Sequence, residues 1–126
     1  MNTLTKTISK YVFAVPFLIF GIMHLMFIEG MKGLVPSYMP FPEFWVALTG
    51  LAFIGASISI IIGIWDYWAS FLLGLMVLIF ALFIHLVNVM GGDQASMANL
   101  LKDLIITGAA WTYTGFVAKS RTFKKA

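Results

Sequence analysis

Long apolar stretches alternate with short polar connections along the whole chain. The stretches cover four ranges, residues 11–28, 44–64, 68–90 and 100–118. Each is close to the length of about 20 residues that an α-helix needs to cross the hydrocarbon core of a bilayer. The pattern predicts an all-α fold in which residues 1–126 form one polytopic four-helix membrane bundle.

Composition supports a membrane protein and excludes several other classes. The chain is 61% hydrophobic and 10% charged, with a mean hydropathy of +0.98, whereas a soluble domain carries roughly 25% charged residues. It has no cysteine, which excludes disulfides, thiolate metal sites and a Cys-x-x-Cys redox relay. The net charge of +3 forms no basic patch interleaved with aromatic residues, so no nucleic-acid partner is expected.

Basic residues near the two chain ends predict the orientation. Lys6 and Lys10 precede the first stretch, and four basic residues follow the last: Lys119, Arg121, Lys124 and Lys125. The positive-inside rule then places both termini in the cytoplasm, which an even number of spans allows. The first stretch is long for the apolar part of a signal peptide, and no small-x-small cleavage site follows it. We therefore expect it to be a retained helix.

Two local patterns predict how the helices pack. The connection "WDYW" is so tight that the second and third spans should form an antiparallel hairpin. Small residues recur at four-residue spacing in two spans: Gly55, Ser59 and Gly63, and Gly108 with Thr112. Such spacing favours close helix packing, and dimerisation through the same faces is the alternative interpretation.

Polar residues gather at the extracytoplasmic ends of the predicted spans. His24, Thr49, His85, Asn88, Lys102 and Asp103 all fall there. Residues three or four apart share a helix face, so His85 and Asn88 point the same way, and Asp103, Thr107 and Thr114 form a stripe with Trp111 beside it. Ionisable residues within a membrane mark functional sites by default. The pattern predicts an outer polar pocket for a ligand or a reaction.

Each of these residues also has a structural interpretation. A lone intramembrane histidine often makes one hydrogen bond between helices. Lys102 and Asp103 alone would be an interfacial anchor and a helix-start residue. No short-range ligand motif joins His24, His85 and Asp103, so no metal site is predicted. Ser57 and Ser59 lack a nearby base in the sequence, and nothing indicates nucleophilic hydrolysis.

The first connection, "EGMKGLVPSYMPFPEF", is the longest and contains three of the four prolines. It is too apolar for a free loop. We expect it either to fold back over the outer face as a lid or to lie in the headgroup region.

Several motifs together resemble the DoxX-like family of small four-helix membrane proteins. They are "GIMH", the proline-rich "LVPSYMPFPEFWVALTG", "FIHLVNVM" and "LLKDLIITG", in this order along nearly the whole chain. The family includes the DoxD subunit of an archaeal thiosulfate:quinone oxidoreductase, and other members have no assigned activity. The resemblance implies a multi-pass protein of a bacterial or archaeal plasma membrane. It indicates the fold more strongly than the reaction.

The resemblance suggests a redox-linked subunit that binds a quinone or another isoprenoid ligand. His24 and His85 would bind the head group and pass protons, with Asp103 orienting a histidine. The expected ligand-binding residues are Thr49, Asn88, Lys102, Thr107 and Trp111. If the chain is an enzyme, it is a quinone-linked oxidoreductase subunit whose electrons come from a partner subunit or a soluble donor. The alternative is a non-catalytic assembly, chaperone or lipid-binding protein whose polar residues are clasps between helices.

Overall fold

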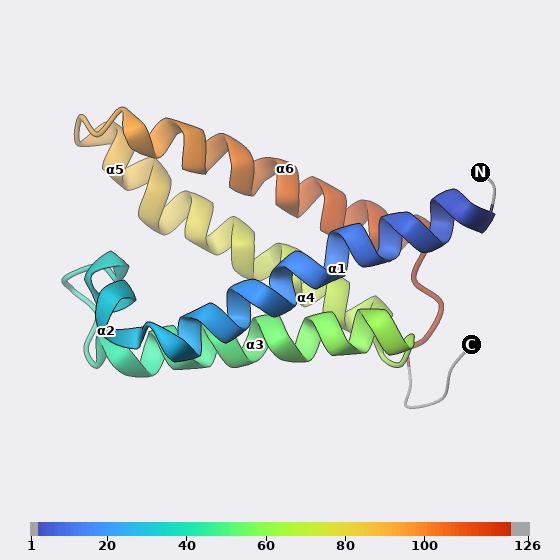
Figure 1. The fold of residues 1–126 in the computed structure, drawn as a ribbon. Helices are drawn as coiled ribbons and strands as arrows, with labels where there is room; N and C mark the ends of the chain where they lie inside the picture. The colour runs from blue at the N-terminus through green and yellow to red at the C-terminus, as the bar shows by residue number, and fades with distance from the viewer. Residues whose placement is uncertain (1–2, 122–126) are drawn as a thin grey trace.

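A computed structural model describes residues 3–121 of the chain, which form helices and connections without a strand. The long helices are α1 (Thr3–Met26), α3 (Pro42–Ile62), α4 (Asp66–Phe80) and α6 (Ala95–Phe116) (Figure 1). Helix α4 continues through a π-helical turn, η2 (Ala81–His85), into α5 (Leu86–Met90). Two short elements, α2 (Ile28–Met31) and η1 (Lys32–Leu34), lie in the first connection.

Within residues 3–121, three helices are long and apolar enough to cross a membrane: Thr3–Met26, Pro42–Ile62 and Asp66–Met90. Only 22–28% of the residues in their most apolar windows are buried inside the protein. Most of their apolar side chains therefore face outward, which suits lipid and not water. This supports an integral membrane protein. Helix α6 falls short of the same criterion because its charged pair, threonines and glycines lower its hydropathy.

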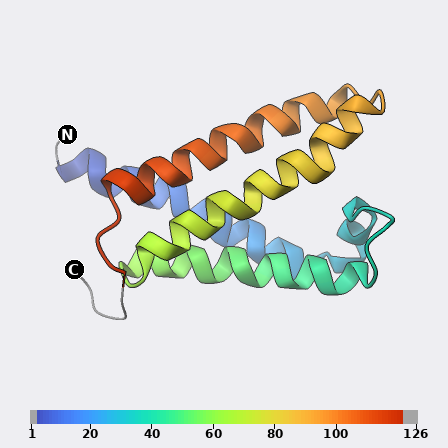
Figure 2. The same ribbon diagram turned by 180° about the vertical axis from the view of Figure 1, so that it is seen from behind.

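The long helices form two antiparallel pairs. Helix α3 packs mainly on α1, and the continuous helix from α4 to α5 packs mainly on α6. The pairs meet near the chain termini and diverge toward the opposite end, as both views show (Figures 1 and 2). The start of α1, which carries Lys6 and Lys10, and the end of α6, which Lys119 and Arg121 follow, lie at the end that carries both termini. Lys124 and Lys125, which also supported the predicted orientation, lie outside the described residues.

A small apolar core joins the two pairs. Its buried members come from all four long helices: Ala14, Phe53, Ile60, Leu73, Val77 and Tyr113. Phe13 of α1 stacks on Tyr113 of α6, with ring centroids 5.8 Å apart. This core holds the pairs together in the half of the protein nearer the termini.

Glycine allows the closest helix approach between α1 and α3. A Cβ on Gly21 would lie 2.6 Å from the Gly50 carbonyl oxygen, and one on Gly50 would lie 2.8 Å from His24 Cβ. The predicted packing through Gly55 and Gly108 is wrong, because an added Cβ at either position would have no atom within 4 Å. The four-residue spacing identified exposed faces in these helices, whereas the contacts use other glycines.

The "WDYW" turn does reverse the chain between α3 and α4. Gly63 and Trp65 both take left-handed backbone conformations there, with φ of 73° and 58°. The two helices touch near this turn and then separate (Figure 2). Each has a more extensive contact with another partner, so the tight turn fixes the direction of the chain but not the main packing.

Helix α6 begins at Ala95, five residues before the predicted span. The Asp93 carboxylate accepts hydrogen bonds from the Ala95 N–H at 3.1 Å and the Ser96 hydroxyl at 2.9 Å. The Ala95 N–H is one of the backbone groups that the first turn of a helix leaves unpaired, and the Ser96 bond adds a side-chain contact. Asp93 therefore stabilises the start of the helix.

The first connection packs against α1 and α3, at the end away from the chain termini. Lys32 lies 2.8 Å from Glu29 and 3.6 Å from Glu43, and the hydrogen bond to Glu29 raises the pKa of Lys32. Leu34, Tyr38 and Phe41 remain at least two-thirds exposed. Since large apolar side chains point outward, the arrangement favours the headgroup location over a lid on the whole outer face.

Candidate functional site

The structure pairs His85 with Asp103 across the α4–α6 helix pair. Nε2 of His85 lies 3.1 Å from Oδ2 of Asp103. The two side chains are 23% and 10% exposed, respectively, so the carboxylate is almost enclosed while one part of the imidazole is accessible. The contact is an ion pair when the imidazole is protonated and a hydrogen bond when Nε2 carries the only ring proton.

His85 ends the π-helical turn η2. The Leu86 N–H bonds to the Ala81 carbonyl oxygen, five residues back, in place of the usual four. Such a turn inserts one residue into the helix and is often found at functional sites. Ala81, at the other end of this turn, is fully buried.

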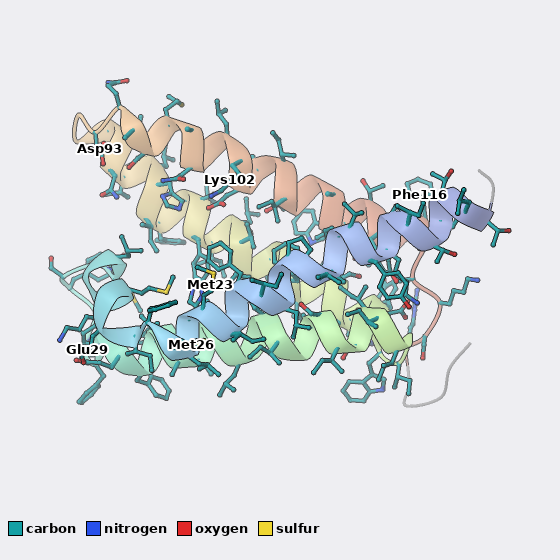
Figure 3. All side chains as sticks on the ribbon, in the orientation of Figure 1. Met23, Met26, Glu29, Asp93, Lys102 and Phe116 are labelled. Carbon is teal, nitrogen blue, oxygen red and sulfur yellow. The ribbon has the colours of Figure 1, made fainter. Side chains whose placement is uncertain are left out.

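Lys102 and Asn88 lie near the pair but are exposed. Nζ of Lys102 lies 3.4 Å from Oδ1 of Asn99 on the same helix. Figure 3 shows Lys102 on α6 and Met23 on α1, on separate helix pairs. The step of about 100° between neighbouring helix residues explains why Lys102 points elsewhere than Asp103.

His24 belongs to the α1–α3 pair and is 8% exposed. Its Nδ1 lies 2.7 Å from the Phe20 carbonyl oxygen, and its ring packs edge-on against Phe53 at 5.4 Å. Because a carbonyl only accepts, Nδ1 donates and Nε2 is the acceptor in the neutral ring. All of these contacts come from α1 and α3, as does half-buried Thr49. The structure brings His85 and Asp103 together and places His24 among other neighbours.

Thr107 and Trp111 bond to the backbone of α4. The Thr107 hydroxyl donates to the Gly74 carbonyl oxygen at 3.2 Å, and the Trp111 indole N–H donates to that of Phe71 at 3.1 Å. Both side chains, which were expected to bind a ligand, thus donate their hydrogen bonds to the neighbouring helix.

Asp66 is the residue whose importance the sequence did not reveal. It is 4% exposed, and its carboxylate accepts from the Ser120 N–H at 2.8 Å, the Tyr113 hydroxyl at 3.2 Å and the Lys119 N–H at 3.3 Å. It fastens the segment after α6 to the start of α4. One feature of the sequence could have indicated its importance: it is the sole acidic residue between Glu43 and Asp93.

Within residues 3–121, no group of three or more His, Asp or Glu side chains is placed to hold a metal ion. Comparison of the chain with protein families, with curated proteins and with solved structures finds no match. Membership of the DoxX-like family therefore stays a prediction from the sequence motifs.

Proposed function

We propose that the chain is a DoxX-like protein that crosses a bacterial or archaeal plasma membrane four times, with both termini in the cytoplasm. Helix α6 is 22 residues long and runs antiparallel to the apolar helix Asp66–Met90. Its Asp103, Thr107 and Thr114 side chains bond across the helix pair, so a fourth span would keep these three away from lipid. The basic residues at the end that carries the termini support the cytoplasmic orientation.

We further propose that the protein binds the head group of a quinone or a related isoprenoid ligand at His85 and Asp103, as a subunit of a membrane redox system. The observation that carries this proposal is the 3.1 Å histidine–carboxylate contact between η2 and α6, with the imidazole partly accessible. A contact that only joined the two helices would not need an imidazole that a ligand can reach. A histidine–carboxylate pair is also the usual arrangement for holding one tautomer of an imidazole in place.

Asp103 determines what His85 can do. Because the carboxylate engages Nε2, Nδ1 is the ring nitrogen left for a ligand. Nδ1 donates to a carbonyl oxygen when the ring is protonated and accepts a proton when it is neutral. His85 can thus deliver one proton and recover it, while Lys102 adds positive charge nearby.

A bound quinone would supply electron and proton acceptance, and its electrons would come from a partner subunit or a soluble donor. His85 would bind one carbonyl of such a head group through the ring nitrogen that Asp103 does not engage. The second histidine expected for the other carbonyl, His24, has its recorded contacts in the α1–α3 pair. Binding through His85 alone would orient the head group less tightly than binding through two histidines.

The direct test is to purify the protein in mild detergent, extract it and identify bound lipids by mass spectrometry. A short-chain quinone is then titrated into the stripped protein. We expect an isoprenoid quinone in the extract and saturable binding in the titration. Absence of both would remove this function.

A non-catalytic assembly role is the second candidate. It is favoured by the series of other bonds that join α6 to α4, among them those of Thr107, Trp111 and Thr114. In that case His85 and Asp103 form one more clasp in the series. Co-purification of a stoichiometric membrane partner without a quinone would support this role.

A further inference from the structure

An apolar groove opens between α3 and α4 near the end that carries the termini. Its volume is about 710 Å³. Ala52, Gly55, Ala56 and Ser59 of α3 form one wall, and Leu72 and Met76 are part of the other. A Cβ added to Gly55 would meet no atom within 4 Å. The small residues therefore leave space here, in contrast to Gly21 and Gly50, where helices fill it.

A second, more polar pocket of about 390 Å³ lies next to the groove. Lys119, Thr114 and Tyr67 line it. Arg121 lines both spaces, so they meet at its side chain.

Arg121 is positioned by an aromatic ring. Its guanidinium carbon lies 4.1 Å from the centre of the Tyr67 ring, a cation–π contact that leaves the N–H donors at the edge of the guanidinium available. Among the described residues, no carboxylate forms an ion pair with Arg121 or with the Lys119 side chain. The nearby Asp66 carboxylate already accepts hydrogen bonds from Tyr113, Lys119 and Ser120.

From this arrangement we propose that the groove and the polar pocket together bind one anionic phospholipid. An acyl chain lies in the groove along Gly55 and Ser59, and the phosphate contacts Arg121 and Lys119. Trp65 and Trp68 also line the groove, and tryptophan is enriched at the level of lipid headgroups. Two cations beside an apolar space match a molecule with one charged end and one apolar end.

A second copy of the chain is the competing occupant, because small residues at four-residue spacing can also pack against a helix. The cations argue against it. If two copies met through this groove, each would present the same lining, which includes Arg121 and, among the described residues, no carboxylate to pair with it. This site lies at the opposite end from His85 and does not depend on quinone binding.

Native mass spectrometry of the full chain in detergent tests the proposal. Phosphatidylglycerol and phosphatidylcholine with identical acyl chains are added in equal amounts. One basic residue near a membrane surface contributes about a fivefold preference for anionic lipid. We expect the protein to retain phosphatidylglycerol at least roughly fivefold more than phosphatidylcholine.

Three variants identify the site. Arg121→Gln should lower the preference for phosphatidylglycerol by roughly fivefold, and Gly55→Leu should lower retention of both lipids by filling the groove. Gly108→Leu is the matched control, because that glycine is equally open but lies outside the groove, and it should behave as the unmodified protein. Circular dichroism checks that all variants remain folded.

Equal retention of the two lipids by the unmodified protein would overturn the proposal, as would a Gly55→Leu variant that retains lipid normally. A dimer that Gly55→Leu dissociates, without loss of lipid, would assign the groove to a second copy instead.

Discussion

Both helix pairs of this protein have a close approach at a glycine, but they differ in their polar contacts. In the α4–α6 pair, a Cβ added to Gly74 would lie 2.7 Å from Trp111 Nε1. Between α1 and α3, contact depends on Gly21, Gly50 and aromatic rings around Phe53. Between α4 and α6, polar side chains bond across the interface at successive levels, from Asp66 near the termini to His85 at the far end. We call the second set the polar seam; its members are Asp66, Ser70, His85, Asp103, Thr107, Trp111, Tyr113 and Thr114.

Close packing at glycine and hydrogen bonding between helices both allow helices to associate within a bilayer. Lipid tails are as apolar as leucine, so helices in a bilayer associate by close packing or by hydrogen bonds and not by hydrophobicity. The glycine contact has no polar group to offer a ligand. The polar seam does, and within residues 3–121 its end far from the termini is the one that combines an ionisable pair with a partly accessible imidazole. The contrast between the two pairs therefore favours the α4–α6 pair as the place of the proposed function.

The largest effect is expected from Gly21→Leu. Even a Cβ at this position would lie 2.6 Å from a backbone oxygen and 2.7 Å from Ile54 Cγ1, so α1 and α3 must separate. We expect a loss of about 3 kcal/mol or more in the free energy of unfolding, measured by denaturation in mixed micelles. Gly108→Leu is the control and should change stability little. A stable Gly21→Leu variant would show that the close approach is not needed.

A smaller loss is expected from Asp66→Ala. The substitution removes the acceptor for the Tyr113 hydroxyl and for the N–H groups of Lys119 and Ser120. Leaving buried donors unsatisfied costs about 2 kcal/mol, and the segment after α6 should become sensitive to protease. Asp66→Asn keeps one acceptor oxygen and should lose less. Equal stability of all three proteins would contradict the role assigned to Asp66.

The smallest effect concerns Ser70 and Thr114, whose hydroxyl oxygens are 2.8 Å apart. Each hydroxyl has one proton and also lies near a carbonyl of its own helix, Asp66 for Ser70 and Ala110 for Thr114. The bond between the helices is therefore shared with local bonds. A double-mutant cycle with Ser70→Ala and Thr114→Val should give a coupling of about 0.6 kcal/mol. A coupling several times larger would mean that this bond dominates the seam.

The sequence predicts the helices well because bilayer crossing imposes a length and a composition. Apolar stretches located the long helices, and the face shared by Asp103, Thr107 and Thr114 is indeed the face that meets α4. The proximity of His85 and Asp103 could be predicted because the connection between their helices is short, and the two residues lie close to it on either side.

Other features depend on contacts that no local pattern contains. The choice of α1 as the partner of α3 is decided by two glycines far apart in sequence, Gly21 and Gly50. The π-helical turn that ends at His85 contains no glycine or proline from which it could be predicted. The position of His24 among phenylalanines follows from that helix pairing. Counting residues along each predicted span placed His24 and His85 at the same depth in the membrane. It could not predict that the two histidines would lie in different helix pairs.

The most direct test of the central claim compares ligand binding with folding in His85→Gln, Asp103→Asn and the double variant. Affinity for a short-chain quinone and the free energy of unfolding are measured on the same samples. If the pair holds a ligand, each single variant should lose at least tenfold in affinity, equivalent to about 1.4 kcal/mol, while stability falls by less. The double variant should bind no worse than either single one. Unchanged affinity, or affinity that declines only in step with unfolding, would show that His85 and Asp103 are a clasp between helices and not a binding site.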